Sequence, residues 1–407
     1  MNLNIKDLEN KARAYALKNA LVYKGKAQTG AVISALFNEG LKKEEVKKYV
    51  QNISKIVNEI NKLSLEEQEQ EFSSLKKEIS VRKVREGLEE LPGAKKGKVI
   101  MRFAPSASGG FHIGHAITLG LIYVYVKKYG GKLYVRIEDT NPENVYKPAY
   151  KMIKEESKWL TENKAKILIQ SERMNLYYGY AEKLIKKNAA YVCTCSGDKF
   201  REYSNEKKNC PCRKLSVKEN LERWKKMLDK KGYKEGEAVL RFKSGMKDKN
   251  PAMRDFPLAR INLTEHPLQK KKYRIWPLMN LAVTVDDIEL KMTHIIRGKD
   301  HRDNAEKQKR IYKILNKKFP WIGFIGRIHF KDLELSTTKM REAIQKKKFK
   351  GWDDERLPTI ASLKKLGYKP FAFWKFSEQV GLSESDKILD KEEYFKLLKA
   401  FNRSNRE

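Results

Sequence analysis

Apolar residues gather in a strand-like run from Val99 to Phe103, and a second such run extends from Leu133 to Ile137. Between them lies a loop rich in Pro, Ser, Ala and Gly, followed by a long apolar segment from Ile113 to Tyr129. This order predicts a strand–loop–helix–strand unit, in which a right-handed crossover connects two parallel strands. We expect the rest of the chain to be organised around this unit.

The flanking regions show helical patterns that alternate with short strand-like runs. Residues 1 to about 90 read as helical, and Ser64 with Glu67 forms a capping-box pattern at a helix start. Downstream, we expect helices near residues 148–161, 176–187 and 221–230, and strands at Val239–Phe242, Leu281–Val285 and His294–Arg297. Alternating strands and helices indicate an α/β protein with a mostly parallel sheet, interrupted by an insertion at about 190–270.

The last part of the chain is expected to be helical. A loop from Lys331 to Lys339 opens a basic helix, Gly367 is suited to end a helix, and Pro370 is suited to begin the next. No run of turn-separated strands occurs here, so we expect no C-terminal β-barrel.

Composition adds a strong positive charge to this picture. Lys and Arg outnumber Asp and Glu by 87 to 52, a formal net charge of +35. A lysine-rich genome accounts for part of the excess, and the remainder favours a polyanionic partner such as nucleic acid. No apolar run is long enough to span a membrane, and the charged first thirty residues do not resemble a signal peptide. We therefore expect a cytoplasmic protein with no membrane partner.

Two histidines lie where the glycine loop meets the predicted helix. His112 and His115 flank Gly114, and Gly109–Gly110 would let the backbone approach a ligand closely. The amides and dipole of a helix N-terminus favour phosphate, and the histidines could donate hydrogen bonds to its oxygens. The alternative is a pair of buried histidines with a purely structural role.

Three ordered motifs resemble one enzyme family. The segment from Arg102 to His115 is similar to the HIGH motif of class I aminoacyl-tRNA synthetases, within the glutamyl/glutaminyl branch. Arg136–Thr140 and Gly351–Ile360 also resemble that branch, and the helical N-terminal region resembles the archaeal and eukaryotic glutamyl type. The resemblance implies ATP-dependent activation of glutamate and its transfer to the 3′-terminal ribose of tRNA(Glu), with tRNA(Gln) as a second candidate acceptor.

The resemblance also gives a domain plan. It implies a helical N-terminal domain (1–95) and a Rossmann-like catalytic domain in two halves (96–190 and 271–350). Between the halves it implies an inserted domain for the tRNA acceptor end (191–270), and after them a helical stem-contact domain (351–407). The anticodon-binding β-barrels of the family are not expected, so a separate anticodon-binding polypeptide acting in trans is one candidate partner. We expect a monomer.

The family's phosphate-handling residues can be placed on this sequence. The resemblance assigns catalysis to His112, Gly114, His115 and Lys339. It assigns ATP binding to Ala104, Pro105, His112, His115 and Lys339. Leu335–Lys339 resembles a divergent KMSKS loop in which Ser336 replaces the first lysine. Arg341 and Lys299 are candidates to replace that lysine, and Mg²⁺ would accompany ATP.

An amino-acid pocket for glutamate needs cations for two carboxylates and an acid for the amine. The resemblance assigns the cations to Arg102 and Arg297 and the acid to Glu138, with Ser106 between them. Relatives usually carry tyrosine where Met279 stands, and methionine offers no useful hydrogen bond. Trp276 and Tyr273 are candidates to compensate. Alternatively, these arginines and Glu138 could form ion pairs that stabilise the fold and bind no substrate.

All four cysteines lie close together in the sequence, in the predicted insertion. Cys193, Cys195, Cys210 and Cys212 form two C-x-C pairs, which could hold a structural zinc ion tetrahedrally. Four protein ligands leave no open position, so a catalytic zinc is not expected. Free buried thiols are the alternative.

Four other functions remain open from the sequence. They are a glutaminyl-tRNA synthetase, a truncated enzyme that glutamylates a modified tRNA base, a non-catalytic tRNA-binding protein, and a nucleotidyltransferase acting on something other than tRNA. The intact His112, Gly114, His115 and Lys339 argue against pure binding, because a binding protein would not need them. The long N-terminal helical region favours a ligase over the truncated enzyme.

Overall fold

The structure is a computed structural model that describes residues 5–79 and 87–404. The chain consists of two compact units, Met1–Glu86 and Gly87–Glu407. The part of the predicted N-terminal helical region that falls on residues 80–86 lies outside the described residues. Among the described helices none is long and apolar enough to cross a membrane.

The first unit consists of helices, as the apolar spacing predicts. They are α1 (Ile5–Val22), α2 (Thr29–Leu36), α3 (Val46–Ile60) and α4 (Leu65–Leu75). Ser64 and Glu67 form the predicted capping box at the start of α4. Buried Gln68 donates to the carbonyls of Gly25, Ile60 and Leu63, and so fixes α4 against the ends of two other helices.

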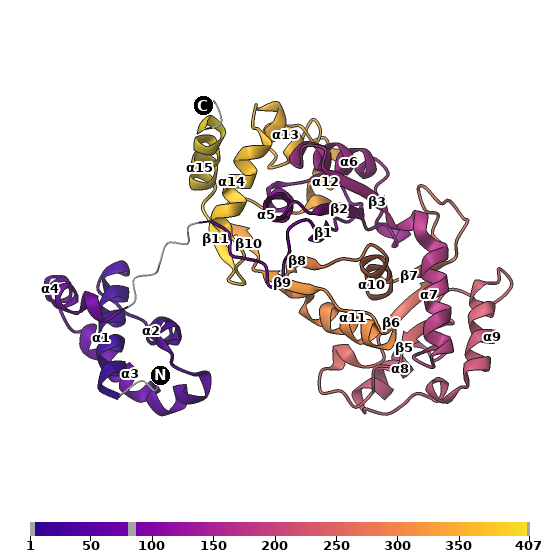
Figure 1. Cartoon of the computed structure of the whole chain (residues 1–407), viewed down its shortest axis with the longest axis horizontal. Helices are drawn as coiled ribbons and strands as arrows, with labels where there is room; N and C mark the ends of the chain where they lie inside the picture. Colours follow the sequence, from indigo (N-terminus) through magenta and orange to yellow (C-terminus); the bar gives the residue numbers. More distant parts are fainter. Residues whose placement is uncertain (1–4, 80–86, 405–407) are drawn as a thin grey trace. The chain divides into compact units, whose positions relative to one another are not determined.

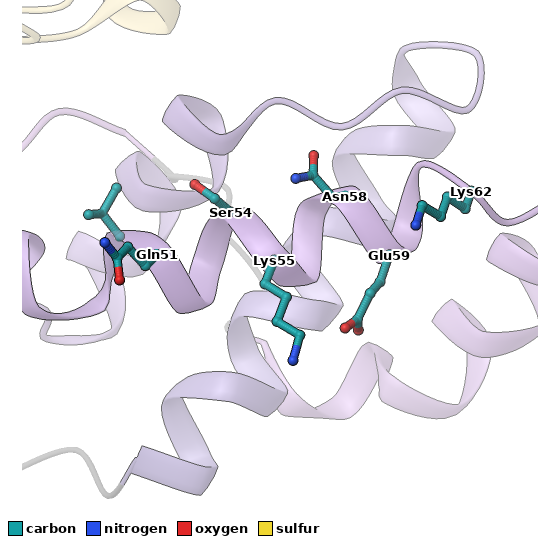
Figure 2. A pocket seen from close by; sticks show the side chains of 7 residues that line it. Gln51, Ser54, Lys55, Asn58, Glu59 and Lys62 are labelled. Carbon is teal, nitrogen blue, oxygen red and sulfur yellow. The ribbon is translucent and has the colours of Figure 1, made fainter.

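A hollow of about 480 Å³ runs along the outer face of α3. Figure 2 shows its polar side chains projecting from α3 and, for Lys62, from the turn that follows the helix. Most of these side chains are exposed to solvent, and they include no histidine or cysteine. The hollow therefore lacks the enclosure and the reactive groups of a catalytic site.

The second unit begins with the predicted parallel unit. Strand β1 (Ile100–Phe103) leads through the glycine loop to α5 (Ile113–Tyr129) and then to β2 (Lys132–Ile137). Helix α6 (Ala149–Leu160) connects β2 to β3 (Ala165–Ile169), giving the parallel order β1-β2-β3. Figure 1 shows these strands beside α5 and α6. Because the strands are parallel, their carboxyl ends meet at one edge.

The second half of the parallel sheet lies against β1. Parallel strands β8 (His294–Gly298) and β9 (Trp321–Ile325) are linked by α11 (Arg302–Ile314). The Thr293 N–H donates to the Ile100 carbonyl at 3.0 Å, which joins the start of β8 to β1. The two halves therefore bring residues almost 200 positions apart to one sheet edge.

One predicted strand is wrong. Residues 281–285 belong to helix α10 (Met279–Glu289), not to a strand. The apolar run from Leu281 to Val285 is buried on all sides, and a short buried run has the same pattern in a helix and in a strand.

The expected insertion contains an antiparallel sheet in the order β4-β5-β6-β7. Its strands are Ala190–Cys193, Val239–Phe242, Pro257–Ile261 and Ile275–Pro277. Helices α7 (Met174–Lys186), α8 (Gly197–Asn205) and α9 (Val217–Leu228) accompany the sheet. Figure 1 shows this part at the opposite end of the second unit from α13 and α14.

The C-terminal region is mainly helical. Its elements are β10 (Ile328–Phe330), α12 (Thr337–Gln345), α13 (Ile360–Lys365), α14 (Pro370–Val380), β11 (Lys387–Leu389) and α15 (Lys391–Ser404). Helix α14 packs on α5, where the Ser377 hydroxyl donates to the Ile117 carbonyl. The close approach needs Gly120, since a Cβ there would lie 2.5 Å from the Ser377 oxygen. Pro370 begins α14 as predicted.

Candidate functional site

The glycine loop after β1 is held from several directions. The Phe111 N–H donates to the buried carboxyl of Glu156 at 2.6 Å, and the Phe111 carbonyl accepts from the Ile360 N–H at 2.8 Å. At Gly109 a Cβ would lie 2.4 Å from Trp352, so only glycine allows this packing. The loop thus fixes the start of α5 against the segment that precedes α13.

His112 and His115 stand at that helix start with their rings stacked. The ring centroids are 3.8 Å apart and the planes differ by 20°. His112 Nδ1 accepts from the Gly114 N–H at 3.1 Å, and His115 Nδ1 accepts from the His112 N–H at 3.3 Å. Both Nδ1 atoms are therefore unprotonated acceptors, and each neutral ring carries its proton on Nε2.

The environment favours the neutral form of both rings. Burial lowers the pKa of His112 to about 4, and burial together with His112 lowers the pKa of His115 well below its usual value. The Ile113 N–H is also used, since it donates to the Pro358 carbonyl at 3.0 Å. The amides of residues 112–114, which we expected to meet phosphate, are therefore already bonded, and the two rings present their Nε2–H groups at this helix start.

A cleft of about 1060 Å³ lies beside the histidines. His112, Gly114, His115 and Thr118 line one side, and Gly298 and Asp300 lie at the end of β8. The segment 325–335 forms the rest of the lining. The cleft has the position expected for a nucleotide in a doubly wound sheet, at the carboxyl ends of parallel strands.

The predicted KMSKS-like residue Lys339 is not on a loop. Helix α12 begins at Thr337, and the Ser336 hydroxyl caps it by accepting from the Lys339 N–H at 3.3 Å. The predicted loop therefore ends at Ser336, because serine is a favoured helix cap. The Lys339 ammonium pairs with Glu334, which raises the pKa of Lys339, and its side chain is 65% exposed.

The two candidates for the replaced lysine differ in their surroundings. The Lys299 ammonium donates to Asp386 at 2.7 Å. Arg341 donates to the Ser108 carbonyl at 3.5 Å, and its guanidinium lies over the Tyr146 ring. Arg341 therefore lies against the glycine loop, whereas Lys299 is held by a carboxylate.

A buried network of charges joins the strands below the cleft. Arg102 on β1 and Arg136 on β2 share the carboxylate of Asp287, which projects from α10. The Arg136 Nη2 also donates to Glu138 at 3.0 Å. Burial opposes ionisation of Asp287, but Arg102 and Arg136 outweigh it and hold its pKa below the usual range.

Arg297 at the end of β8 is a buried cation with incomplete partners. It is 7% exposed, and its Nη1 donates to the neutral side chain of Gln308 at 3.0 Å. Its Nε has no hydrogen-bond partner within residues 5–79 and 87–404. Burial and the charge of Arg102 lower the pKa of Arg297 to about 10, while the charge of Glu138 acts in the opposite direction.

Glu138 and Ser106 line a second cavity of about 410 Å³. The Glu138 N–H donates to the Pro105 carbonyl at 2.9 Å, so the ends of β1 and β2 stay paired beyond the strands. Ala104 precedes this pairing at the end of β1. Met279 at the start of α10 and Arg260 on β6 form part of the other wall.

The candidates to compensate for Met279 lie elsewhere. Trp276 is buried and stacks on His266, and Tyr273 packs edge-on against Tyr178. Arg260 and Arg341 are the cationic side chains that line the cavity in the described part of the chain. The cavity therefore offers positive charge where the resemblance predicts an aromatic hydroxyl.

The sulfurs of Cys193, Cys195 and Cys210 form one close group, and the Cys212 sulfur lies beside that of Cys195. The Cys193 and Cys210 sulfurs are 3.9 Å apart, as are those of Cys195 and Cys212. The sulfurs of Cys193, Cys195 and Cys210 all lie within 4.8 Å of one another. Four thiolates about 2.3 Å from one zinc ion stand about 3.8 Å apart, so this donor set fits zinc.

Several buried polar residues of the site were missed by the sequence reasoning. Asp286 and Asp287 directly follow the run that was taken for a strand, and two acids beside an apolar run could have indicated a charge network. Glu156 under the glycine loop gave no local signal, since it occurs in an ordinary amphipathic helix. Asp139 and His266 were also missed, because their contact joins distant segments.

Comparison with known proteins places this arrangement in a family. Residues 98–405 match the model of the tRNA synthetases class I (E and Q), catalytic domain. The chain is 43% identical over 380 residues to the glutamate–tRNA ligase of Methanocaldococcus jannaschii, covering 93% of this chain and 68% of that protein. It is 42% identical over 390 residues to the glutamate–tRNA ligase of Pyrococcus abyssi, covering 93% of this chain and 68% of that protein.

A solved structure shares the fold. A glutamate tRNA ligase from Elizabethkingia meningosepticum, in complex with its amino acid, matches with a TM-score of 0.54 and 21% identity, covering 76% of this chain and 69% of that one. From the matched family model and the archaeal relatives, we conclude that this chain belongs to the class I tRNA synthetases of the glutamyl and glutaminyl group.

Proposed function

We propose that this chain is a glutamate–tRNA ligase, which activates glutamate with ATP and transfers it to the 3′-terminal ribose of tRNA(Glu). Family membership supports ATP as the energy source, and the archaeal relatives named above are glutamate–tRNA ligases. The net charge of +35 suits binding of a tRNA backbone.

The observation that carries the glutamate assignment is that the Arg297 guanidinium is buried and only partly hydrogen-bonded. A buried guanidinium with an unpartnered Nε is costly unless an anion completes its hydrogen bonds. A substrate carboxylate would supply that anion, and Glu138 would bind the amine. Asp287 occupies two of the three nitrogens of Arg102, so Arg102 would reach the substrate through Nη1.

The chemistry needs no general base for its first step. An oxygen of the α-carboxylate attacks the α-phosphorus of ATP, and the bond to the bridging oxygen of pyrophosphate breaks. The Nε2–H groups of His112 and His115 would donate to the α-phosphate oxygens as charge grows there. Lys339 would exchange Glu334 for the leaving pyrophosphate, and Mg²⁺ would neutralise phosphate charge.

The second step transfers the glutamyl group. The 2′-hydroxyl of the terminal ribose attacks the carbonyl carbon of the adenylate, the bond to the phosphate oxygen breaks, and AMP leaves with the hydroxyl proton passing to it or to water. Ala104, Pro105, Ser106 and Gly114 contribute backbone and small side chains that allow both substrates to approach.

The cysteine cluster would hold a structural zinc ion. The Arg223 Nη1 lies 3.5 Å from the Cys212 sulfur, and the Tyr191 hydroxyl lies 3.5 Å from the Cys210 sulfur. Such donors stabilise thiolates in the outer shell of a metal site. Metal analysis of the purified protein should find about one zinc per chain for a four-thiolate site. Metal-free protein of unchanged stability would rule out the site.

Exchange of labelled pyrophosphate into ATP, in the presence of tRNA(Glu), tests the assignment. Wild-type protein should exchange with glutamate and much less with glutamine or aspartate. Arg297→Gln should lower kcat/KM for glutamate by about 10²–10³-fold, the usual loss for a buried charged contact, and leave KM for ATP unchanged. The exposed Arg201→Gln is the matched control. Wild-type kcat/KM for glutamate in Arg297→Gln would contradict the proposal.

A further inference from the structure

The segment between β6 and β7 reaches from the inserted sheet to the end of β2. Within it, the His266 N–H and carbonyl both bond to Lys270, which closes a tight turn. The turn places the His266 ring against Asp139, which follows Glu138 directly. His266 is fully buried, although sequence reasoning assigned it no function.

The hydrogen bonds of His266 define its protonation. Nδ1 accepts from the N–H groups of Leu268 at 3.2 Å and Gln269 at 3.1 Å, so it carries no proton. Nε2 lies 3.0 Å from the Asp139 carbonyl, which can only accept, and the ring proton therefore lies on Nε2. Stacking on Trp276, with centroids 4.9 Å apart, fixes the plane of the ring.

Asp139 is itself held on every side. Its carboxylate accepts from the Ser171 N–H at 2.8 Å, the Ser171 hydroxyl at 2.7 Å and the Tyr150 hydroxyl at 2.6 Å. His266 adds the bond to its backbone carbonyl. Asp139 thus joins the end of β2 to the segment that precedes α7, through Ser171, and to the segment between β6 and β7, through His266. It is one residue beyond Glu138, the side chain expected to bind the substrate amine.

Two further contacts run beside this one. Arg260 on β6 donates to Asn141 at 3.1 Å, and Asn262 donates to Glu143 at 2.9 Å. Arg260 and Glu143 are partly exposed and Asn262 is buried, whereas both partners of the His266 contact are buried. The same two segments form facing walls of the 410 Å³ cavity, with Glu138 on one and Arg260 on the other. The buried contact therefore sets the separation of those walls.

We infer that His266 is a positioning residue for the amino-acid pocket, which fixes the inserted domain against the Glu138 end of β2. The inference rests on the proposed function, because it takes glutamate as the occupant of the cavity. It also gives a route by which RNA bound to the inserted domain would act on the amino-acid pocket, since a displacement of the β6–β7 segment must move either His266 or Asp139.

Two amide variants test the roles of the two ring nitrogens of His266 separately. In His266→Asn the side-chain oxygen replaces Nδ1 and keeps the turn, but no donor reaches Asp139. In His266→Gln the amide nitrogen replaces Nε2 and keeps the donor to Asp139. We expect His266→Asn to raise KM for glutamate by about tenfold or more, the loss typical of one buried hydrogen bond, with KM for ATP unchanged. His266→Gln should restore most of the affinity for glutamate.

A matched control is the other buried histidine that donates to a backbone carbonyl. His294 Nε2 lies 3.1 Å from the Pro92 carbonyl, away from the cavity lining, so His294→Asn should leave KM for glutamate close to wild type. A merely structural role for His266 would instead lower kcat with all substrates and leave the ratio of the two KM values unchanged. That result would overturn the inference.

Amide hydrogen exchange provides a readout that needs no activity. The Ala107 N–H donates to the Glu138 carbonyl, and the Ser171 N–H donates to Asp139, so both amides report on this junction. His266→Asn should speed exchange at both amides, and His266→Gln should not. If wild-type protein activates no amino acid, the proposed function fails while this comparison still decides the role of His266. Unchanged exchange in His266→Asn would contradict it.

Discussion

Arg102 and Asp287 form a buried two-point ion pair, in which Nε meets Oδ1 and Nη2 meets Oδ2, both at 3.2 Å. The same carboxylate accepts from the Arg136 Nη1 at 2.6 Å. One acid on α10 thus holds an arginine on each of the first two strands. The network also orients Glu138, because the Arg136 Nη2 donates to that carboxylate at 3.0 Å.

Loss of this shared carboxylate should weaken the fold as well as the site. Asp287→Asn would leave Arg102 and Arg136 buried without their main counter-charge. We expect a loss of about 3–5 kcal/mol in the free energy of unfolding, the usual range for a broken buried ion pair. Urea denaturation measures the change, and the exposed Asp198→Asn is the control. A loss below about 1 kcal/mol would be typical of a surface pair and would contradict the buried network.

The stacked histidines should act on the rate of activation and not on binding of the amino acid. In the proposed mechanism each neutral Nε2–H would donate to charge that develops on the α-phosphate, so the ground state would gain little from it. His112→Ala combined with His115→Ala should lower the kcat of pyrophosphate exchange by about 10³-fold, with little change in KM for glutamate. Normal exchange by the folded double variant would exclude the proposed mechanism.

Glu156 should make stability depend on pH. Burial raises the pKa of Glu156 to about 8 from its ordinary value of 4.5. A carboxyl whose pKa is raised by folding stabilises the folded state below pH 4.5, and this contribution is lost as the pH rises through about 8. The free energy of unfolding should therefore fall between these values in wild type and fall less in Glu156→Gln.

The exposed neighbour Glu155 offers the matched control for that comparison. Glu155→Gln should keep the wild-type dependence on pH, because its side chain is 63% exposed. Chemical denaturation at pH 5, 6.5 and 8 is the measurement. Parallel curves for wild type and Glu156→Gln would show that Glu156 titrates normally.

Met279 should limit affinity for the amino acid. It lines the cavity beside Glu138 and Arg260, and methionine cannot donate a hydrogen bond to a carboxylate. Met279→Tyr should lower KM for glutamate by about tenfold, as expected for one hydrogen bond to a charged group. Met279→Phe has the ring without the hydroxyl and should show no such gain. Equal KM values for the two variants would assign the effect to packing alone.

The central unit could be predicted from the sequence because its signals are local. Helix α5 begins at Ile113 and ends at Tyr129 as the apolar run indicates, and Val239–Phe242 is the predicted strand. Leu281–Val285 was mistaken for a strand because burial on all sides removes periodicity. The helix start at Thr337 depends on the Ser336 cap, a signal present in the sequence but not used.

The charge network and the His266 contact could not be predicted in the same way. Arg102 and Asp287 are 185 positions apart, and Asp139 and His266 are 127 apart. Residue spacing in the sequence cannot predict such contacts, because only the folded chain brings the two residues together. The motifs therefore predict which groups react, while the residues that contact those groups became visible only in three dimensions.

The most direct test of the central claim is attachment of labelled amino acids to a purified tRNA(Glu) transcript in the presence of ATP and Mg²⁺. We expect glutamate and not glutamine to become attached, through an ester that mild alkali removes, because the product is a 3′-terminal ribose ester. Label that ribonuclease A releases on an internal nucleotide, and not on the 3′-terminal adenosine, would indicate attachment to a base. That result, attachment of glutamine in preference to glutamate, or no attachment of glutamate at all would contradict the assignment as a glutamate–tRNA ligase.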